Sequence, residues 1–98
     1  MVTPRLLLCA ALALLLACQA SGESQRVRGV VVNVEASSIA RATGVTVRDA
    51  EGREYRFRVD PSVDVTPGHL REHMTFGEPV TVFYTQTSDG LVAQRITD

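Results

Sequence analysis

The sequence predicts an all-β domain: a small five-stranded barrel with one short helix between its third and fourth strands. Apolar residues recur at every second position from Arg26 onward, which is the period of half-buried strands. Two Gly-containing turn segments separate successive alternating runs and are typical of tight hairpins. One proline-led segment instead carries apolar residues four apart, which is helical spacing. At 98 residues, the chain has room for one domain at most.

The first three strands follow one another with a single long connection. A loop over residues 36–43 is too long for a simple turn, whereas residues 49–52 place Gly52 where a tight hairpin needs a positive φ. The alternating apolar positions of the three strands are Val30, Val32 and Val34; Val45 and Val47; and Tyr55, Phe57 and Val59.

A short helix is expected next, over residues 66–74. Thr66 is a suitable N-cap, Pro67 suits the first helical position, and Leu70 and Met74 form an apolar pair. Two further strands follow, with apolar positions at residues 80–84 and 92–96. They are joined through residues 87–90, where Asp-Gly is again a turn signal.

This element order, three strands, a helix and two strands, is that of an OB-like barrel in which the helix closes one end. An SH3-like barrel is the alternative, and the two differ in whether Leu70 and Met74 of the helix pack into the open end of the barrel. A barrel of this size is filled by its own side chains, so any ligand is expected on the outer surface or the loops rather than inside.

The chain begins with a segment that is typical of export. Arg5 precedes an uncharged apolar stretch, residues 6–17, that is shorter than a membrane-spanning helix needs. Its end, Leu15-Leu16-Ala17-Cys18, resembles the lipobox of bacterial lipoproteins, which implies that Cys18 becomes the lipidated first residue. An ordinary secretory signal with a chance cysteine is the alternative. The resemblance implies a cell-envelope location, at the outer membrane facing the periplasm if the cell is Gram-negative.

This interpretation divides the chain into three parts. Residues 1–17 form a signal peptide, residues 18–25 a small and polar tether, and residues 26–98 the barrel domain. Cys9 is lost with the signal and Cys18 is consumed by lipid, so the domain is expected to have no disulfide.

The domain itself resembles the small β-barrel domains of uncharacterised bacterial lipoproteins and is similar to the periplasmic bacterial OB-fold group. The residues that carry this resemblance are the opening Gly-Val-Val-x-x-Val over residues 29–34, the hairpin Val-Arg-Asp-Ala-Glu-Gly-Arg over residues 47–53, and Gly-Leu-Val-Ala-Gln-Arg-Ile over residues 90–96. These motifs are mainly structural, and the resemblance implies no particular activity.

His69 and His73, the two histidines of the chain, lie four residues apart and therefore on one face of the expected helix. Imidazoles at this spacing could share Zn(II) or Cu(II), with Glu72, Met74 or Glu78 as further ligands. Two histidines supply only half of a tetrahedral shell, so the alternative is that both simply face solvent. No other cofactor is expected.

A candidate partner surface lies on the outside of the barrel. Arg48, Arg56 and Arg58 alternate with apolar residues on the second and third strands, and Phe83 lies on the outer face of the fourth. Arginines and an aromatic on such a barrel suggest a nucleic acid or an oligosaccharide. Loss of Arg5 would leave nine of the 10 basic residues against 11 acidic ones, which disfavours nucleic acid.

The alternative for these arginines is structural: they would pair across strands with Glu35, Glu51 and Glu54 and protect the sheet from edge pairing. No serine has a base and an orienting acid at recognisable spacing, so we expect no enzyme. The sequence thus predicts a lipid-anchored envelope protein acting as a non-catalytic binding or assembly module, with an envelope protein or a glycan as partner. A periplasmic metal-binding domain using His69 and His73 is the alternative.

Overall fold

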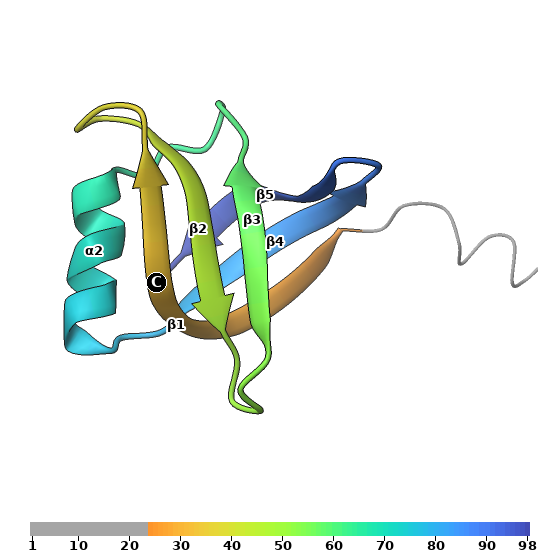
Figure 1. Cartoon of the computed structure of the whole chain (residues 1–98), viewed down its shortest axis with the longest axis horizontal. Helices are drawn as coiled ribbons and strands as arrows, with labels where there is room; N and C mark the ends of the chain where they lie inside the picture. The colour runs from red at the N-terminus through yellow and green to blue at the C-terminus, as the bar shows by residue number, and fades with distance from the viewer. Residues whose placement is uncertain (1–23) are drawn as a thin grey trace, which may run out of the picture.

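The computed structural model describes residues 24–98; the predicted signal peptide, Cys18 and most of the predicted tether lie outside this range. Five strands and one helix make up the described chain, and the strands close into a barrel (Figure 1). No helix within residues 24–98 is long and apolar enough to span a bilayer. In chain order the elements are β1 (Gln25–Ala36), β2 (Ala42–Arg48), β3 (Glu54–Val59), α2 (Pro67–Phe76), β4 (Val80–Thr87) and β5 (Gly90–Thr97).

The barrel closes in the order β1-β2-β3-β5-β4. All neighbouring strands are antiparallel except β3 and β5, whose parallel ladder pairs Phe57 with Leu91, Arg58 with Val92, and Val59 with Ala93. A closed five-stranded barrel with its helix between β3 and β4 is the predicted OB-like arrangement, so the predicted fold class is confirmed.

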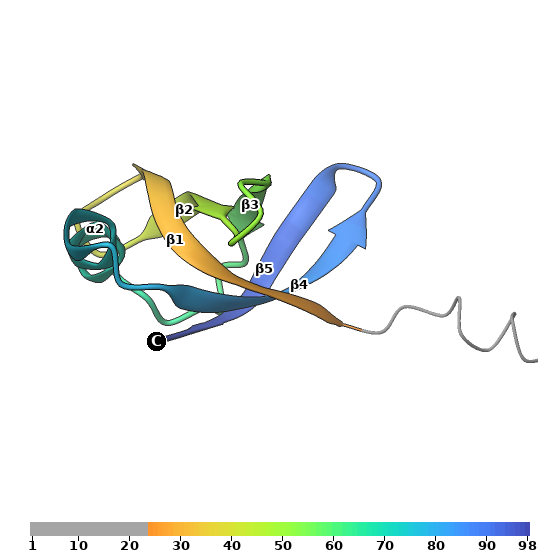
Figure 2. The same cartoon turned by 90° about the horizontal axis from the view of Figure 1, so that it is seen from below.

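Strand β1 belongs to two ladders, because it bends across the end of the barrel (Figures 1 and 2). Its first part, up to Gly29, pairs with β4, and its second part, from Val30, pairs with β2. A side chain at Gly29 would overlap the carbonyl oxygen of Arg48 and lie 2.9 Å from Cγ1 of Val47. Glycine is therefore required at the bend because the β2 backbone approaches it so closely.

A β-bulge between Val31 and Asn33 then changes which side of β1 faces inward. Val31 is 3% exposed and belongs to the core, whereas Val30 and Val32 are only half-buried. After the extra residue, Val34 packs against the core. The strict alternation predicted for Val30, Val32 and Val34 is therefore wrong for the first part of β1, because a bulge reverses the side-chain period.

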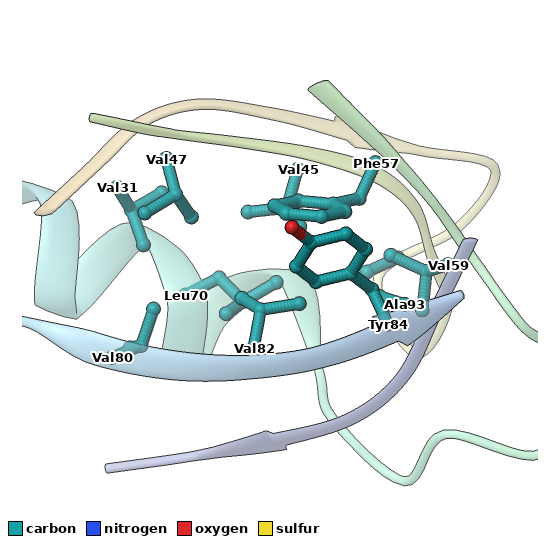
Figure 3. Close-up of a cluster of buried hydrophobic side chains, with 11 residues drawn as sticks. Val31, Val45, Val47, Phe57, Val59, Leu70, Val80, Val82, Tyr84 and Ala93 are labelled. Carbon is teal, nitrogen blue, oxygen red and sulfur yellow. The ribbon is translucent and has the colours of Figure 1, made fainter. Parts of the chain in front are cut away.

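The barrel interior is filled by side chains from all five strands and from α2 (Figure 3). The ring of Phe57 lies against that of Tyr84, with centroids 5.0 Å apart and planes tilted by 55°. Leu70 reaches in from α2 and is fully buried. The buried core cluster consists of Val31, Ala42, Val45, Val47, Phe57, Val59, Leu70, Val80, Val82, Tyr84 and Ala93.

Helix α2 begins as its sequence predicts and runs two residues beyond the predicted end at Met74, to Phe76. The Thr66 hydroxyl accepts a hydrogen bond from the His69 N–H at 3.2 Å, Pro67 opens the first turn, and Gly77 ends the helix with φ 65°. Its inward face differs from the predicted one, because Met74 is 37% exposed and His73 is 6% exposed. Leu70 closes the barrel as expected, but His73 takes the place predicted for Met74.

Both hairpins form where they were predicted. Gly52, with φ 83°, ends the turn between β2 and β3, while Gly90, with φ 122°, starts β5 after a turn at Ser88 and Asp89. The long connection is shorter than expected and covers residues 37–41, since both flanking strands extend into it. Strand β1 also starts at Gln25, one residue before the predicted domain boundary.

Replacing Gly29 by alanine is expected to destabilise the barrel by about 1–3 kcal/mol or more, because the new methyl group overlaps the backbone of β2. Urea unfolding followed by circular dichroism measures the change. Gly68→Ala is the matched control: no atom lies within 4 Å of a Cβ at this helical position. It should be neutral or stabilising by up to about 1 kcal/mol. Equal midpoints for the two variants would contradict the role of the bend.

Candidate functional site

The outer face of β2 and β3 carries the three arginines that the sequence singled out. Arg48 pairs with Glu54 on the next strand at 2.9 Å, using its Nη2 atom, and its Nε donates to the same carboxylate oxygen. Arg56 pairs with Glu35 of β1, also at 2.9 Å. Both pairs are exposed, so each adds little to stability. Two of the three arginines thus make the cross-strand pairs expected of a structural role.

The pair between Arg56 and Glu35 depends on a glycine in the strand between them. Gly44 of β2 pairs with Glu35 on one side and with Arg58 on the other. A Cβ at Gly44 would lie 3.3 Å from Cβ, Cδ and Oε2 of Glu35, so the Glu35 side chain lies directly over this position. The carboxylate therefore crosses β2 to reach β3.

Arg58 differs from the other two arginines on this face. Among residues 24–98 no carboxylate lies within 4 Å of its guanidinium group. It borders a groove of about 370 Å³ between β2, β3 and the turn that joins β4 to β5. The lining residues are Glu35, Thr43, Gly44, Arg56, Phe57, Arg58, Asp89, Gly90 and Leu91. This groove therefore contains charged side chains of both signs.

Phe83 does not join this surface. It lies on β4, which is separated from β3 by β5, and the guanidinium carbon of Arg95 lies 4.0 Å from the centroid of its ring. This cation–π contact with a neighbouring strand gives Phe83 a structural partner. The structure thus brings Arg56 and Arg58 together and leaves Arg48 and Phe83 outside the groove.

A second hollow, of about 340 Å³, lies between the β1–β2 loop and the segment after β3. Asp60 lines it and accepts hydrogen bonds from the Ser62 hydroxyl at 2.6 Å and from the Ser62 N–H at 2.9 Å. These two bonds, with a smaller effect of the Arg58 charge, hold the pKa of Asp60 below its ordinary value of 3.8. Asp60 is therefore an Asx-turn residue of the loop.

The two histidines of α2 meet a third residue that the sequence did not indicate. Nε2 of His69 lies 2.9 Å from Oδ1 of Asp98, and Nε2 of His73 lies 3.0 Å from the same oxygen. Asp98 follows β5, so these two contacts join the end of the last strand to α2. The hydrogen bond from His69, with a smaller effect of His73, lowers the pKa of Asp98. The three side chains are called the His-His-Asp cluster below.

His73 is fixed in this cluster from both ends of its ring. Its Nδ1 lies 3.1 Å from the carbonyl oxygen of Glu78, just after the end of the helix. Because a carbonyl only accepts hydrogen bonds, Nδ1 must carry the proton and Nε2 is left to face Asp98. Of the predicted helpers, Glu78 contributes through its backbone, whereas the cluster does not include Glu72 or Met74.

Comparison of the chain with protein-family models, with curated proteins and with solved structures found no match.

Replacing Ser62 by alanine is expected to raise the pKa of Asp60 towards 3.8, because the largest cause of its lowering is the Ser62 hydroxyl. An NMR pH titration of the Asp60 carboxyl carbon measures this pKa. Ionised Asp60 stabilises the fold above about pH 3.8, and this contribution is lost as the pH falls through the lowered pKa. The variant should therefore lose less stability on acidification. Ser88→Ala is the control, and an unchanged Asp60 midpoint in Ser62→Ala would contradict the assignment.

Proposed function

We propose that the chain is a lipid-anchored protein of the bacterial cell envelope and that its barrel is a non-catalytic binding module for a cell-wall glycan. The glycan ligand is proposed from the groove beside Arg58, because this groove is lined by both basic and acidic side chains. The anchor is proposed from the sequence, since Arg5, the apolar stretch of residues 6–17 and the Ala17-Cys18 junction together resemble a lipoprotein signal.

The groove lies where OB-type barrels commonly bind ligands. The face of strands 2 and 3 and the neighbouring β4–β5 turn bind oligonucleotides or oligosaccharides in this fold. Glu35 and Asp89 line the groove together with Arg56 and Arg58, so a polyanion would meet repulsion as well as attraction. Sugar hydroxyls, in contrast, can donate to carboxylates and accept from guanidinium groups. The net charge of −1 also disfavours nucleic acid.

The position of the anchor is compatible with this ligand. β1 starts at Gln25, so the chain between Cys18 and the barrel is short. The barrel would then stay close to the membrane surface, within reach of the cell wall beside it.

Replacing Cys18 by alanine tests the anchor. The variant should move from the membrane fraction to the soluble periplasmic fraction, because it lacks the acyl chains that supply the membrane affinity of the parent protein. Fractionation with immunoblotting measures the distribution in a bacterial host, and Cys9→Ala serves as the control that stays in the membrane. A Cys18→Ala protein that still sediments with membranes would contradict lipid anchoring.

Replacing Arg58 by alanine tests the ligand. Co-sedimentation of the detergent-extracted full chain with purified peptidoglycan should weaken at least about tenfold, because one charged hydrogen-bond donor is lost from the groove. Arg48→Ala is the matched control, since Arg48 lies on the same face but outside the groove. Equal retention of both variants would contradict a glycan site here, even if the membrane anchor is confirmed.

A further inference from the structure

The His-His-Asp cluster joins parts of the chain that are far apart in sequence. His69 and His73 lie on α2, and Asp98 follows the last strand. Their ligand atoms lie within 4.8 Å of one another. The centroids of the two imidazole rings are also 4.8 Å apart, and the rings meet edge to face. Both Nε2 atoms point at a single carboxylate oxygen. Three donor atoms thus converge on one point at the surface.

The orientation of both rings leaves one nitrogen of each for a cation. Nδ1 of His73 is used by the Glu78 carbonyl at 3.1 Å, so Nε2 is the nitrogen that faces Asp98. Nε2 of His69 faces the same carboxylate oxygen. A cation at this point would therefore meet two imidazole nitrogens and a carboxylate oxygen, which are ligand types that zinc accepts.

The distances are close to those of a metal site. Zinc bonds of 2.0–2.2 Å in a tetrahedron place neighbouring ligand atoms about 3.3 Å apart. The nitrogen-to-oxygen separations of 2.9 and 3.0 Å need to open by about 0.3–0.4 Å. The ligand atoms all lie within 4.8 Å of one another, so the two Nε2 atoms need to approach by up to about 1.5 Å. The side chains of His69 and Asp98 are 44% and 68% exposed, which gives the ion an entry path and a side open to water.

The backbone contact of His73 is also typical of metal ligands. A ligating histidine usually donates its other ring N–H to a carbonyl or carboxylate, which fixes the tautomer and the ring orientation. The Glu78 carbonyl does this for His73, and Gly77 makes the contact possible, since its left-handed φ of 65° turns the chain back toward the helix.

We propose that His69, His73 and Asp98 form a Zn(II) site, with Nε2 of each histidine and a carboxylate oxygen of Asp98 as ligands and water in the fourth position. Such a three-ligand site is open to an additional ligand. The ion also links α2 to the end of β5. Because the ion binds the folded chain and not the unfolded one, it should raise the free energy of unfolding of the domain.

Isothermal titration calorimetry with zinc chloride tests the site. The full chain is used in detergent, with Cys9→Ser and Cys18→Ser in every sample so that no thiol competes. One equivalent of zinc should bind with a dissociation constant in the micromolar range or below, and Tm should rise with free zinc. No saturable heat at about 100 μM zinc, roughly a hundred times a micromolar dissociation constant, would overturn the proposal.

Two variants identify the ligands without disturbing the core. His69→Gln and Asp98→Asn change exposed side chains, and each should weaken zinc binding by at least about tenfold while the circular dichroism spectrum stays the same. Glu72→Gln, on the exposed side of the same helix, is the control and should bind as the parent does. Parent-like affinity of Asp98→Asn would overturn the three-ligand site.

A parallel titration with Cu(II) tests the choice of metal. Copper should bind more tightly than zinc at the same ligands, as it does at most nitrogen and oxygen sites, and should lose affinity in the same two variants. Copper binding without zinc binding would overturn the assignment to zinc.

Discussion

The bend of β1 at Gly29 is the constraint on which the rest of the barrel depends. One strand has to pair with β4 and then with β2, and it can do so only if its backbone passes directly against Arg48. This bend closes one side of the barrel, and the parallel ladder of β3 with β5 closes the other. Closure gives each of the five strands a neighbour on both sides. Each face of the sheet therefore has a fixed role: the inner face packs and the outer face is open to contacts.

Because core side chains fill the barrel, the candidate sites described above lie on its surface. Helix α2 determines the position of one of them, the His-His-Asp cluster. α2 closes one end with Leu70, and the same packing buries one side of His73. Two members of the His-His-Asp cluster, His69 and His73, therefore lie on a rigid helix, which favours a precise ligand geometry, whereas Asp98 follows the last strand. The groove beside Arg58 has a different support, since it depends on the junction of β3, β5 and the β4–β5 turn.

The order of strands and helix was predictable because each element has a local signal. Alternating valines, the turn glycines and the Thr66-Pro67 start of the helix depend only on neighbouring residues. The bulge after Val31 was missed because a run of consecutive valines hides the change of period. Met74 was preferred over His73 as an inward residue on hydrophobicity alone, although His73 has the Glu78 carbonyl as a partner for its polar end.

The candidate sites show the same limit. The sequence indicated both histidines from their spacing, and it indicated the arginines from strand alternation. It had no signal for Asp98, because the approach of the last strand to α2 is a property of the closed barrel. The separation of Phe83 from Arg58 has the same origin: β5 inserts between β3 and β4, which no local pattern reveals. Chain topology is therefore what the sequence could not supply.

The dual pairing of β1 also affects when the domain can fold. Its early residues find their partners in β4, as when Arg28 donates to Thr81, 53 residues further along the chain. Contacts of such long sequence separation form late and slowly, because a large loop must close before they contribute. The first part of β1, up to Gly29, thus has no partner until β4 has been synthesised, whereas its second part can pair with β2 much earlier. For a protein that we propose is exported, the barrel can therefore close only after nearly the whole chain has been made.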